Sequence, residues 1–508
     1  MNFQPISKPS ITIEDITLTA GELNSYLSYF FENMHCHFPF LERPFLPPKT
    51  LSSSPLLFWT IITVSSSFPN RSLYERLQPI VRRLLASGLC PFAMSQELCQ
   101  ALCLLCLWPL EASDPNDDPH FMYAGMATHI AMQMGLHRPQ FTHEFKQIKE
   151  LGVNPHETPT SRWMTWCACI FVEHQLASKV GVPCGVRDLW ALQKSLNHAH
   201  PEESPPLPSL IRHQLLLIFL RDRYLNTVSW DAPTTSGLCE PPMRLNILKL
   251  FSTELDQWES RHDMLEETTS VLLHATRVLI AGFCLAADLA LVEHQTAQAT
   301  ILLLLHRGVD SATAVLNIVA PLAWETLPVH IIRAVRDAGV FSAQLLRIER
   351  SQPSSTASGT LLSPFRDPPS SSSSRPSTWS ERSSFTDDST LICLLDRAID
   401  ILRSVSYGRD FSTRNKILLE VLRQEATAKD AQTSGPDVES QLGHGEGVAK
   451  SNVHGNDDLR HLSAHGFIRF QARMGANIFW DAVEYGKGAH DWTQNEKDIF
   501  LEMQSELG

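Results

Sequence analysis

From residue 20 to residue 350, the pattern of hydrophobic and polar positions is that of α-helices. Apolar residues recur at steps of three and four, and the alternation typical of half-buried strands is rare. The predicted helices are 20–34, 56–67, 73–87, 96–108, 119–135, 160–182, 210–226, 243–259, 268–293, 297–320 and 329–350. For 56–67, the β-branched residues leave a strand open as an alternative. No repeat of fixed length emerges, so we predict an all-α fold, a large irregular multi-helix bundle rather than a solenoid.

The segment Pro119–Pro139 carries clear helix start and stop signals. Acidic residues at 117–118 precede a first-turn proline, which is typical of a capped helix start. Gly135 stands where a helix stop needs a left-handed residue, and Leu136 comes next, where such a stop packs an apolar side chain onto the last turn. The sequence therefore predicts a helix that ends at Gly135 with a positive φ angle.

The same segment presents a face of apolar and small residues. Its apolar positions follow steps of four, three and four: Tyr123, Ala127, Ile130 and Met134. Ala124, Ala127 and Ala131 keep the surface small, so a second helix can approach closely. We expect these alanines to form the tightest helix contact of the domain.

Capping residues mark further helix starts. Thr19, Ser95 and Thr160 each precede a predicted helix and can accept hydrogen bonds from its first turn. Residues 1–18, ahead of the first cap, are predicted to be an extended, weakly ordered N-terminal segment. The run Leu302–Leu305 is interpreted as part of a buried helix.

The C-terminal third alternates between helical and polar stretches. Residues 351–390 are rich in Ser and Pro and cannot bury enough apolar surface to order themselves, so we predict a disordered insertion. Residues 391–428 continue the helical pattern, and 429–458 form a second polar insertion that is predicted to be disordered. The C-terminal segment 459–508 includes an aromatic-rich helical pattern at 467–485.

Charge and cysteine usage narrow the class of protein. The chain has 508 residues with 42 Lys and Arg against 55 Asp and Glu, a net charge of −13, and 43% hydrophobic residues. Such an acidic chain is a poor nucleic-acid binder unless a basic module is attached. Its 11 cysteines lie mostly within apolar runs, which favours reduced core thiols in an intracellular protein. No secretory signal opens the chain and no apolar run reaches about 18 uninterrupted residues, so we predict no membrane span.

Catalytic motifs do not occur in the sequence. It has no Gly-rich phosphate loop, no Gly-x-Ser-x-Gly elbow and no His-Glu-x-x-His helix. Among its many acids and histidines, no pairing is distinguished by spacing. We therefore predict a protein that is not an enzyme, with no catalytic, cofactor-binding or metal-ligating residues.

Several groups resemble ligand sets but lack the required spacing. Adjacent residues in 35–37 (His-Cys-His) cannot all point at one ion, and the scattered histidines His444, His454, His461 and His465 fail the same test. The acidic loop 111–118 lacks the central glycine and terminal glutamate of a calcium loop. Cys103 and Cys106 lie mid-helix among leucines, which favours core packing over redox chemistry. His129 and His137, eight residues apart, are interpreted as satisfied polar groups, with ligand binding as the alternative.

Three segments together resemble a known family. They are the His/Phe/Pro-rich stretch 35–45; Gly125, Ala127 and Ala131 with Gly-Leu-His-Arg at 135–138; and the Arg-x-x-Trp helix with its Gly-x-Pro turn at 162–183. In this order they resemble the fungal-specific transcription factor domain, the regulatory middle region of fungal zinc-binuclear-cluster transcription factors.

The third segment departs from that pattern at three places. Glu173-His174 stands where the family usually has Asp-Arg, and Val182 stands where it has Arg. Only Trp163 of the usual tryptophan pair is kept, with Trp166 offset. These changes weaken any expectation of the family's ionic contacts but leave the helix–turn pattern intact.

The resemblance implies a regulatory helical domain over 19–350 and a role in RNA polymerase II transcription in a fungal nucleus. The family's zinc cluster needs six close cysteines beside a basic segment, and these 508 residues contain no such group. We therefore expect the cluster to lie upstream of Met1 or to be lost. This chain would then hold no zinc or other cofactor, and DNA would be reached only through that absent module.

The same resemblance implies transcriptional co-regulators as partners, and it leaves a small-molecule effector and a homodimer open. The alternative to a transcription regulator is a helical interaction scaffold that does not bind DNA. A ligand-sensing helical module is a further alternative, and it is compatible with a role in transcription.

Overall fold

The computed structural model describes most of the first 350 residues and a smaller share of the remaining chain. The described residues are 3–42, 45–89, 94–111, 119–138, 145, 158–180, 182–186, 207–229, 238–262, 264–285, 295–350, 388–405, 416, 419–420 and 422–424. Both predicted disordered insertions lie essentially outside this set, as does the C-terminal segment 459–508.

Helices make up nearly all of the described chain, which confirms the all-α fold. The α-helices are α1 (Ala20–Tyr29), α2 (Pro47–Ser53), α3 (Pro55–Ser66), α4 (Arg71–Leu89), α5 (Gln96–Leu107), α6 (His120–Gln133), α8 (Pro159–Val180), α10 (Ser209–Ser229), α11 (Pro241–Ser260), α12 (Glu267–Gly282), α13 (Gln295–Val319), α14 (Val329–Arg350) and α15 (Asp388–Val405). A π-helical turn (Phe30–Met34) and 3₁₀ turns at His35–His37, Phe283–Leu285 and Trp324–Thr326 complete them. The β-branched segment at 56–67 is helical.

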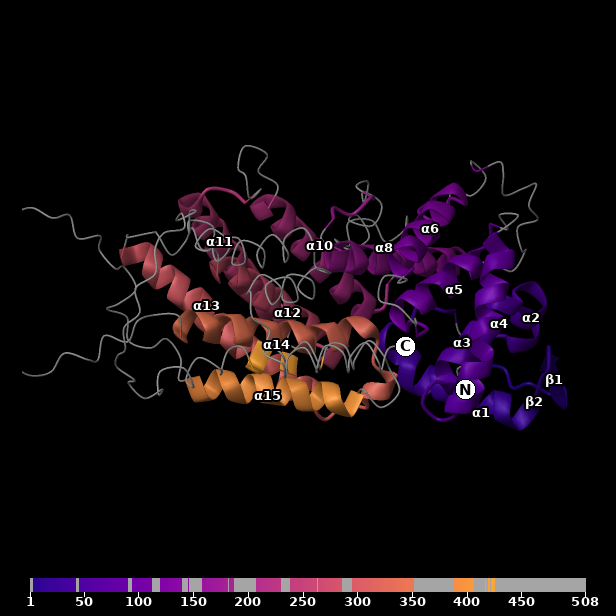
Figure 1. The fold of residues 1–508 in the computed structure, drawn as a ribbon. Helices are drawn as coiled ribbons and strands as arrows, with labels where there is room; N and C mark the ends of the chain where they lie inside the picture. Colours follow the sequence, from indigo (N-terminus) through magenta and orange to yellow (C-terminus); the bar gives the residue numbers. More distant parts are fainter. Residues whose placement is uncertain are drawn as a thin grey trace, which may run out of the picture.

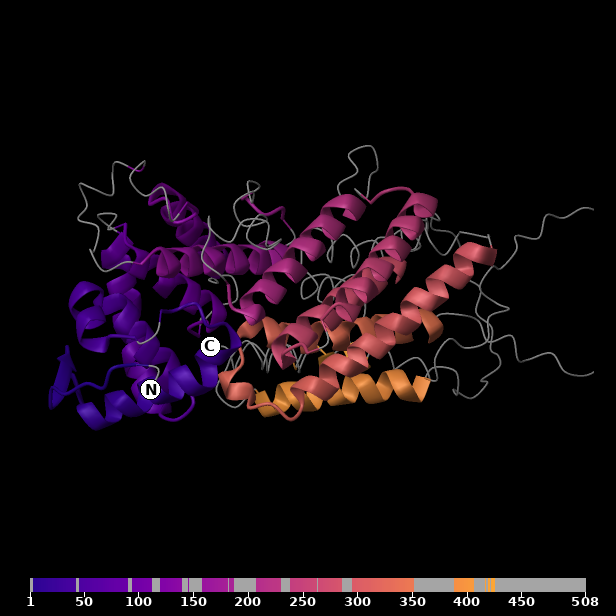
Figure 2. The ribbon, with the colours of Figure 1, turned by 180° about the vertical axis from the view of Figure 1, so that it is seen from behind.

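The helices form an elongated bundle in which α8 occupies the middle (Figure 1). Helices α1 to α5 gather at one end, and α10 to α15 gather at the other. Figure 2 shows the same arrangement from behind, with α14 and α15 side by side. Helix α8 contacts α5 and α6 on one side and α10 on the other, and a single hydrophobic core extends from Phe3 to Leu422.

The N-terminal segment is more ordered than its sequence suggested. Strands β1 (Ser10–Ile13) and β2 (Ile16–Thr19) pair antiparallel, and this hairpin is the one sheet found among the described residues. Ile11, Ile16 and Leu18 are buried. The expectation of weak order missed this, because the apolar residues of so short a hairpin are stabilised only by the helices they pack against.

Charged contacts join the hairpin to α4. Glu14, which has a φ of 50°, and Asp15 lie at the hairpin turn. Arg83 pairs with Glu14 at 2.5 Å, and Arg76 pairs with Asp15 at 3.0 Å. All four side chains are largely exposed, so solvent screening leaves each pair a small contribution to stability. The buried isoleucines therefore anchor the hairpin more strongly than its charges do.

The stop of α6 has the predicted geometry. Gly135 adopts a φ of 69°. The Leu136 amide donates to the carbonyl of Ala131, and the Gly135 amide donates to the carbonyl of Met132, which is the hydrogen-bond pattern of a Schellman stop. Leu136 is fully buried, so the stop is fixed by packing as well as by backbone conformation.

The alanine face of α6 is buried, but it is not the most extensive contact. Ala124, Ala127 and Ala131 have no solvent exposure, and α6 packs against both α5 and α8. The pair α12–α13 and the pair α14–α15 nevertheless make more extensive contacts. The extent of a contact does not measure how closely two helices approach, so the expectation that these alanines form the tightest contact of the domain stays a prediction.

Two of three predicted caps are confirmed. Thr19 and Glu22 form a reciprocal capping box, and Ser95 accepts from the Leu98 amide at 3.0 Å. For α8, Thr158 rather than Thr160 is the cap, accepting from the Ser161 amide at 3.0 Å. Proline can occupy the first helical position, so Pro159 moves the start of this helix forward. Pro119 caps α6 without a side-chain hydrogen bond, and the acidic pair at 117–118 lies outside the described residues.

Two helix boundaries and the exposure of one leucine differ from the prediction. Helix α12 ends at Gly282 and passes into a 3₁₀ turn, whereas the pattern predicted it to continue to Glu293. Helix α15 begins at Asp388, inside the predicted insertion, because Asp388 supplies an acidic first turn. In the leucine run of α13, Leu303 is 48% exposed, since no single face can bury four consecutive helical residues.

Two described helices are long and apolar enough to cross a membrane by length and composition alone, Glu267–Leu285 and Gln295–Val319. The most apolar window of the first is 78% buried inside the bundle, and that of the second is 50% buried. Each carries an arginine, Arg277 and Arg307, that binds Asp256 of α11. We interpret both as core helices of the bundle.

Replacing Gly135 with Ala should lower the free energy of unfolding by at least about 1 kcal/mol, because an L-residue is strained at its φ of 69°. A Cβ there would also overlap the Phe145 ring. The matched control is Gly125→Ala in the interior of α6, where a Cβ meets nothing within 4 Å. That control should gain up to about 1 kcal/mol. Urea unfolding of the three proteins measures both, and equal stabilities would contradict the proposed stop.

Candidate functional site

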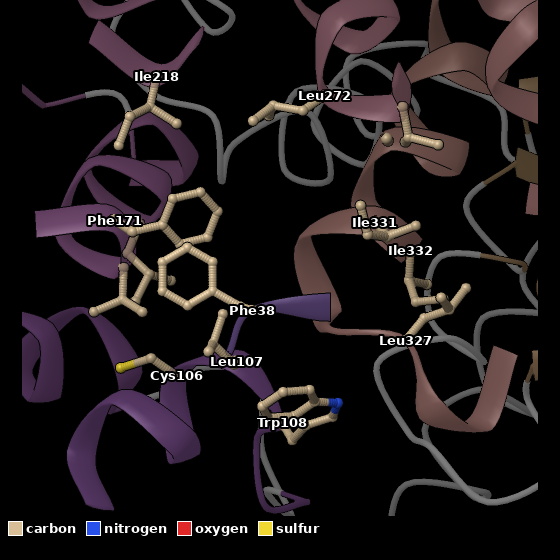
Figure 3. Packing of buried hydrophobic residues seen from close by; sticks show 14 of the residues in the cluster. Phe38, Cys106, Leu107, Trp108, Phe171, Ile218, Leu272, Leu327, Ile331 and Ile332 are labelled. Atoms are coloured by element: carbon tan, nitrogen blue, oxygen red, sulfur yellow. The ribbon is translucent and has the colours of Figure 1, made fainter. Parts of the chain in front are cut away.

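Two of the three signature segments meet in the centre of the molecule. The Phe38 ring stacks on the Phe171 ring of α8, with centroids 4.4 Å apart (Figure 3). Trp108, at the end of α5, lies close by and donates from Nε1 to the carbonyl of Thr326 at 3.0 Å. Ile331 and Ile332 of α14 lie across from these rings (Figure 3). The stretch 35–45 thus serves as packing between the two ends of the bundle.

A buried arginine joins the second signature segment, at the end of α6, to the third, on α8. Arg162, at the start of α8, donates from Nη2 to the carbonyl of Met134 at 2.5 Å. Met134 ends α6, where carbonyl groups have no partner within the helix. The side chain of Arg162 is almost fully buried. The Arg-x-x-Trp helix therefore completes the helix stop of the Gly-Leu-His-Arg segment.

The residues that depart from the family pattern are also buried. Glu173 accepts from the amide of Gly185 at 3.1 Å and so holds the turn that comes after α8. His174 packs against the Phe219 ring, and its Nδ1 lies 3.8 Å from Asp222 Oδ1. Burial, assisted by Arg221, lowers the pKa of His174 to about 3, so its imidazole is neutral.

The histidines considered as ligands point in different directions. His35 is buried and accepts from the amide of Leu41 at 3.0 Å, whereas His37 lies 3.3 Å from the hydroxyl of Thr326. His129 is exposed, while His137 contacts two aromatic rings, so the structure does not bring this pair together. Within the described ranges, no three His, Cys, Asp or Glu residues are placed to hold a metal ion. His444, His454, His461 and His465 lie outside those ranges.

The cysteines of α5 are core residues, as predicted. Cys103 lies 3.7 Å from Cys169 of α8, sulfur to sulfur, and Cys106 approaches the carbonyl of His120 at 3.5 Å. Burial raises the pKa of the Cys103 thiol. A buried thiol with a raised pKa is a poor nucleophile, which argues against redox chemistry at this pair.

A small cavity lies where α8, α10, α12 and α14 meet. Its volume is about 70 Å³. The polar and charged lining residues are Gln175, Ser178, Lys179, Arg221, His330, Arg333, Arg336 and Asp337, and the remainder are aliphatic residues mainly from α12. The sequence analysis singled out none of these residues. They come from three helices that are far apart in the chain, and no local spacing could have grouped them.

The cavity carries more positive than negative charge. Four cationic side chains line it against the single carboxylate of Asp337, which pairs with Arg336 at 2.6 Å. Arg221 donates from Nη2 to Gln175 Oε1 at 2.8 Å. Burial lowers the pKa of Arg221 to about 10, which still leaves it charged at neutral pH.

His330 adds a neutral polar group to this wall. Its side chain is 8% exposed, and neither ring nitrogen has a hydrogen-bond partner. Burial, together with the nearby Arg333 and Arg221, lowers its pKa to about 3. Gln175 is 9% exposed, and its Nε2 likewise has no hydrogen-bond partner.

A second hollow, between α15 and residues 419–424, has a different character. Its arginines are paired with its own acids: Arg403 with Glu420 at 3.3 Å, and Arg423 with Asp396. Charge is therefore balanced within this hollow, and the basic cavity beside α8 is the stronger candidate site.

Comparison with known proteins finds a family match in the N-terminal part of the chain. The family model described as the fungal specific transcription factor domain matches residues 27–203, a stretch that contains all three signature segments. Residues 27–203 are thus similar to a fungal specific transcription factor domain. The match ends before α10, so one wall of the basic cavity, from α8, belongs to this domain and the other walls come later in the chain.

Similar curated proteins are fungal and carry regulatory names. The chain is 30% identical over 264 residues to transcriptional regulatory protein SEF1 of Candida albicans, covering 50% of this chain and 27% of that protein. It is 26% identical over 271 residues to putative transcription factor SEF1 of Saccharomyces cerevisiae, covering 48% of this chain and 23% of that protein. Regulatory protein LEU3 of Saccharomyces cerevisiae is 20% identical over 286 residues, covering 51% and 32%. The aligned stretches thus span a third or less of these proteins, and no solved structure matches the chain.

Replacing Arg162 with Met keeps most of the aliphatic stem but removes the donor to the Met134 carbonyl. We expect a loss of about 1–3 kcal/mol in the free energy of unfolding, the cost of an unsatisfied buried group. The control is Arg76→Met, which removes an exposed ion pair and should cost clearly less than Arg162→Met. Urea denaturation compares the two, and the contact would be unimportant if both variants lost the same small amount.

Stability should fall on acidification because of the buried neutral histidines. His174 has a folded pKa of about 3 against an ordinary value of 6.5, so the unfolded chain takes up a proton first as the pH falls. Above pH 6.5 this histidine is neutral in both the folded and the unfolded chain, and no stability is lost. Between pH 6.5 and pH 3 the unfolded chain is protonated and the folded protein is not, so the free energy of unfolding falls progressively. Between pH 7 and pH 5 this single group should remove about 2 kcal/mol.

Urea unfolding of His174→Phe at pH 7 and pH 5 measures how much of the pH-dependent loss of stability comes from His174. The variant should show a smaller pH-dependent loss than the parent protein. His129→Phe, which changes an exposed ring, should keep the parent's pH dependence. An unchanged loss in His174→Phe would mean that this histidine is protonated in the folded protein.

Proposed function

We propose that this chain is the regulatory portion of a fungal transcription regulator that controls RNA polymerase II transcription in the nucleus. The observation that carries the proposal is the family match over 27–203, supported by relatives whose names denote transcription factors. All three signature segments within that match are packed into a single core, as a folded regulatory domain requires.

In this proposal, DNA binding and the recruitment of partners are carried out by different modules. The chain has a net charge of −13, so contact with DNA would be made by a zinc-cluster module outside these residues. Transcriptional co-regulators would be recruited by the helical body, and the chain would act by binding rather than by catalysis. The basic cavity beside α8 offers a place where a small effector could influence that recruitment.

A tethered reporter assay tests the proposal. The full chain, fused to an unrelated DNA-binding domain in a fungal host, should change expression of a reporter that carries the matching site. The Gly125→Ala variant should retain the effect, whereas Gly135→Ala should weaken it as folded protein is lost.

Two results would count against the proposal. One is a fusion that enters the nucleus, folds and leaves the reporter unchanged. The other is tight, sequence-specific DNA binding by the purified chain alone, since only non-specific binding weaker than about micromolar is expected at physiological salt.

A further inference from the structure

The basic cavity between α8, α10, α12 and α14 has the properties of a binding site rather than of ordinary packing. Lys179, Arg221, Arg333 and Arg336 bring four positive charges to its wall, in a protein whose net charge is −13. One carboxylate in the wall, Asp337, pairs with Arg336, and Asp222 lies beside Arg221. Charged side chains lose water where they line a small cavity, so an anion bound there would meet strong hydrogen-bond donors.

Two buried neutral groups point to the same conclusion. His330 and Gln175 both line the cavity, both are more than nine-tenths buried, and both keep polar atoms without a hydrogen-bond partner. Buried polar atoms are nearly always hydrogen-bonded, so these atoms indicate that something else satisfies them. A neutral imidazole can donate one hydrogen bond and the Gln175 amide nitrogen can donate two. Both suit an acceptor-rich ligand.

We propose that this cavity binds an oxyanion group, a carboxylate or a phosphate, carried by a small acidic molecule. Arginine matches such groups because its planar guanidinium can donate two parallel hydrogen bonds. Arg221 is already oriented by its 2.8 Å hydrogen bond to Gln175. Arg221 would supply charge, while His330 and Gln175 would supply neutral donors.

The size of the cavity limits what can enter. Its volume of about 70 Å³ is far smaller than the roughly 300–1,000 Å³ of pockets that enclose a drug-sized ligand. It is enough for about two water molecules or one oxyanion group. The acidic group would therefore be buried, and the rest of the molecule would extend outward past the partly exposed Ser178 and Lys179.

The position of the cavity gives the site a regulatory consequence, and this step rests on the proposed function. Gln175 and Lys179 belong to the matched domain, whereas Arg221 and Arg333 lie after it in the chain. An anion held between them would link the matched domain to the later helices. Its binding would favour arrangements in which these parts stay together.

Calorimetric titration of the purified full chain tests the binding itself. Sodium phosphate and sodium succinate serve as probes at constant ionic strength, with sodium chloride as the reference. We expect saturable binding of at least one probe and a matching rise in melting temperature. Whichever of the two binds tighter distinguishes a phosphate-bearing from a carboxylate-bearing ligand.

Three variants locate the site. Arg221→Gln should weaken binding by about tenfold or more, because it removes a charge-assisted donor. Arg277→Gln is the matched control: it removes an arginine of α12 that binds Asp256 and Glu259 outside the cavity, and it should leave affinity unchanged. Ala275→Leu fills the cavity without changing charge and should abolish binding.

The outcomes separate this inference from the proposed function. The absence of saturable binding, or equal affinity in the parent and in Ala275→Leu, would overturn it and would mean that the cavity holds only water. Should Arg221→Gln fail to fold, Ala275→Leu decides alone. Because binding is measured without transcription, a silent reporter together with saturable binding would reject only the proposed function. An active reporter without binding would reject only the oxyanion site.

Discussion

The burial of α8 on every side is the constraint on which the rest of the structure depends. Residues 161–177 of this helix are buried without interruption. A helix with only one apolar face could not be placed in this way, since its polar face would lose water and gain nothing. Helix α8 carries polar residues on that inner surface, and the surrounding elements bind several of them.

These partners come from three neighbouring parts of the chain. Gln96 and Gln100 of α5 donate to Ser161 at 2.5 Å and to Thr165 at 3.0 Å, respectively. The stop of α6 receives Arg162, and the turn after α8 binds Glu173. Satisfied networks of this kind specify a unique arrangement, because a shifted helix would leave several buried groups unpaired at once. The central helix of the bundle is therefore fixed by polar matching as much as by apolar packing.

Local signals in the sequence were enough to predict the helical class and most helix positions. Gly135 was predictable because a left-handed stop has a known residue requirement, and the Thr19 cap because its hydrogen bonds lie within one turn. Thr158 was missed because proline at position 159 shifts the start, and the N-terminal hairpin because its stability comes from distant helices. The hairpin could not be predicted because it depends on contacts between segments far apart in the chain, whereas the cap at Thr158 was a local signal that the prediction misplaced.

The candidate site could not be predicted from the sequence at all, because distant helices form it. Gln175, Arg221 and His330 look ordinary where each stands, on helices whose other residues follow the usual helical periodicity. Only the packing of α8, α10 and α14 brings them into one cavity and removes them from water. A buried histidine with a pKa near 3 cannot be deduced from the sequence, because the cause is burial itself.

The continuous core has a consequence for where this protein can be divided. The family match ends at residue 203, yet one hydrophobic cluster contains described residues on both sides of that border and joins α8 to α10 and α14. A fragment cut at that border would expose the inner surface of α8, including polar groups whose partners lie in the helices left behind. The segment that matches the family is therefore shorter than the packed hydrophobic core, which includes residues of α15.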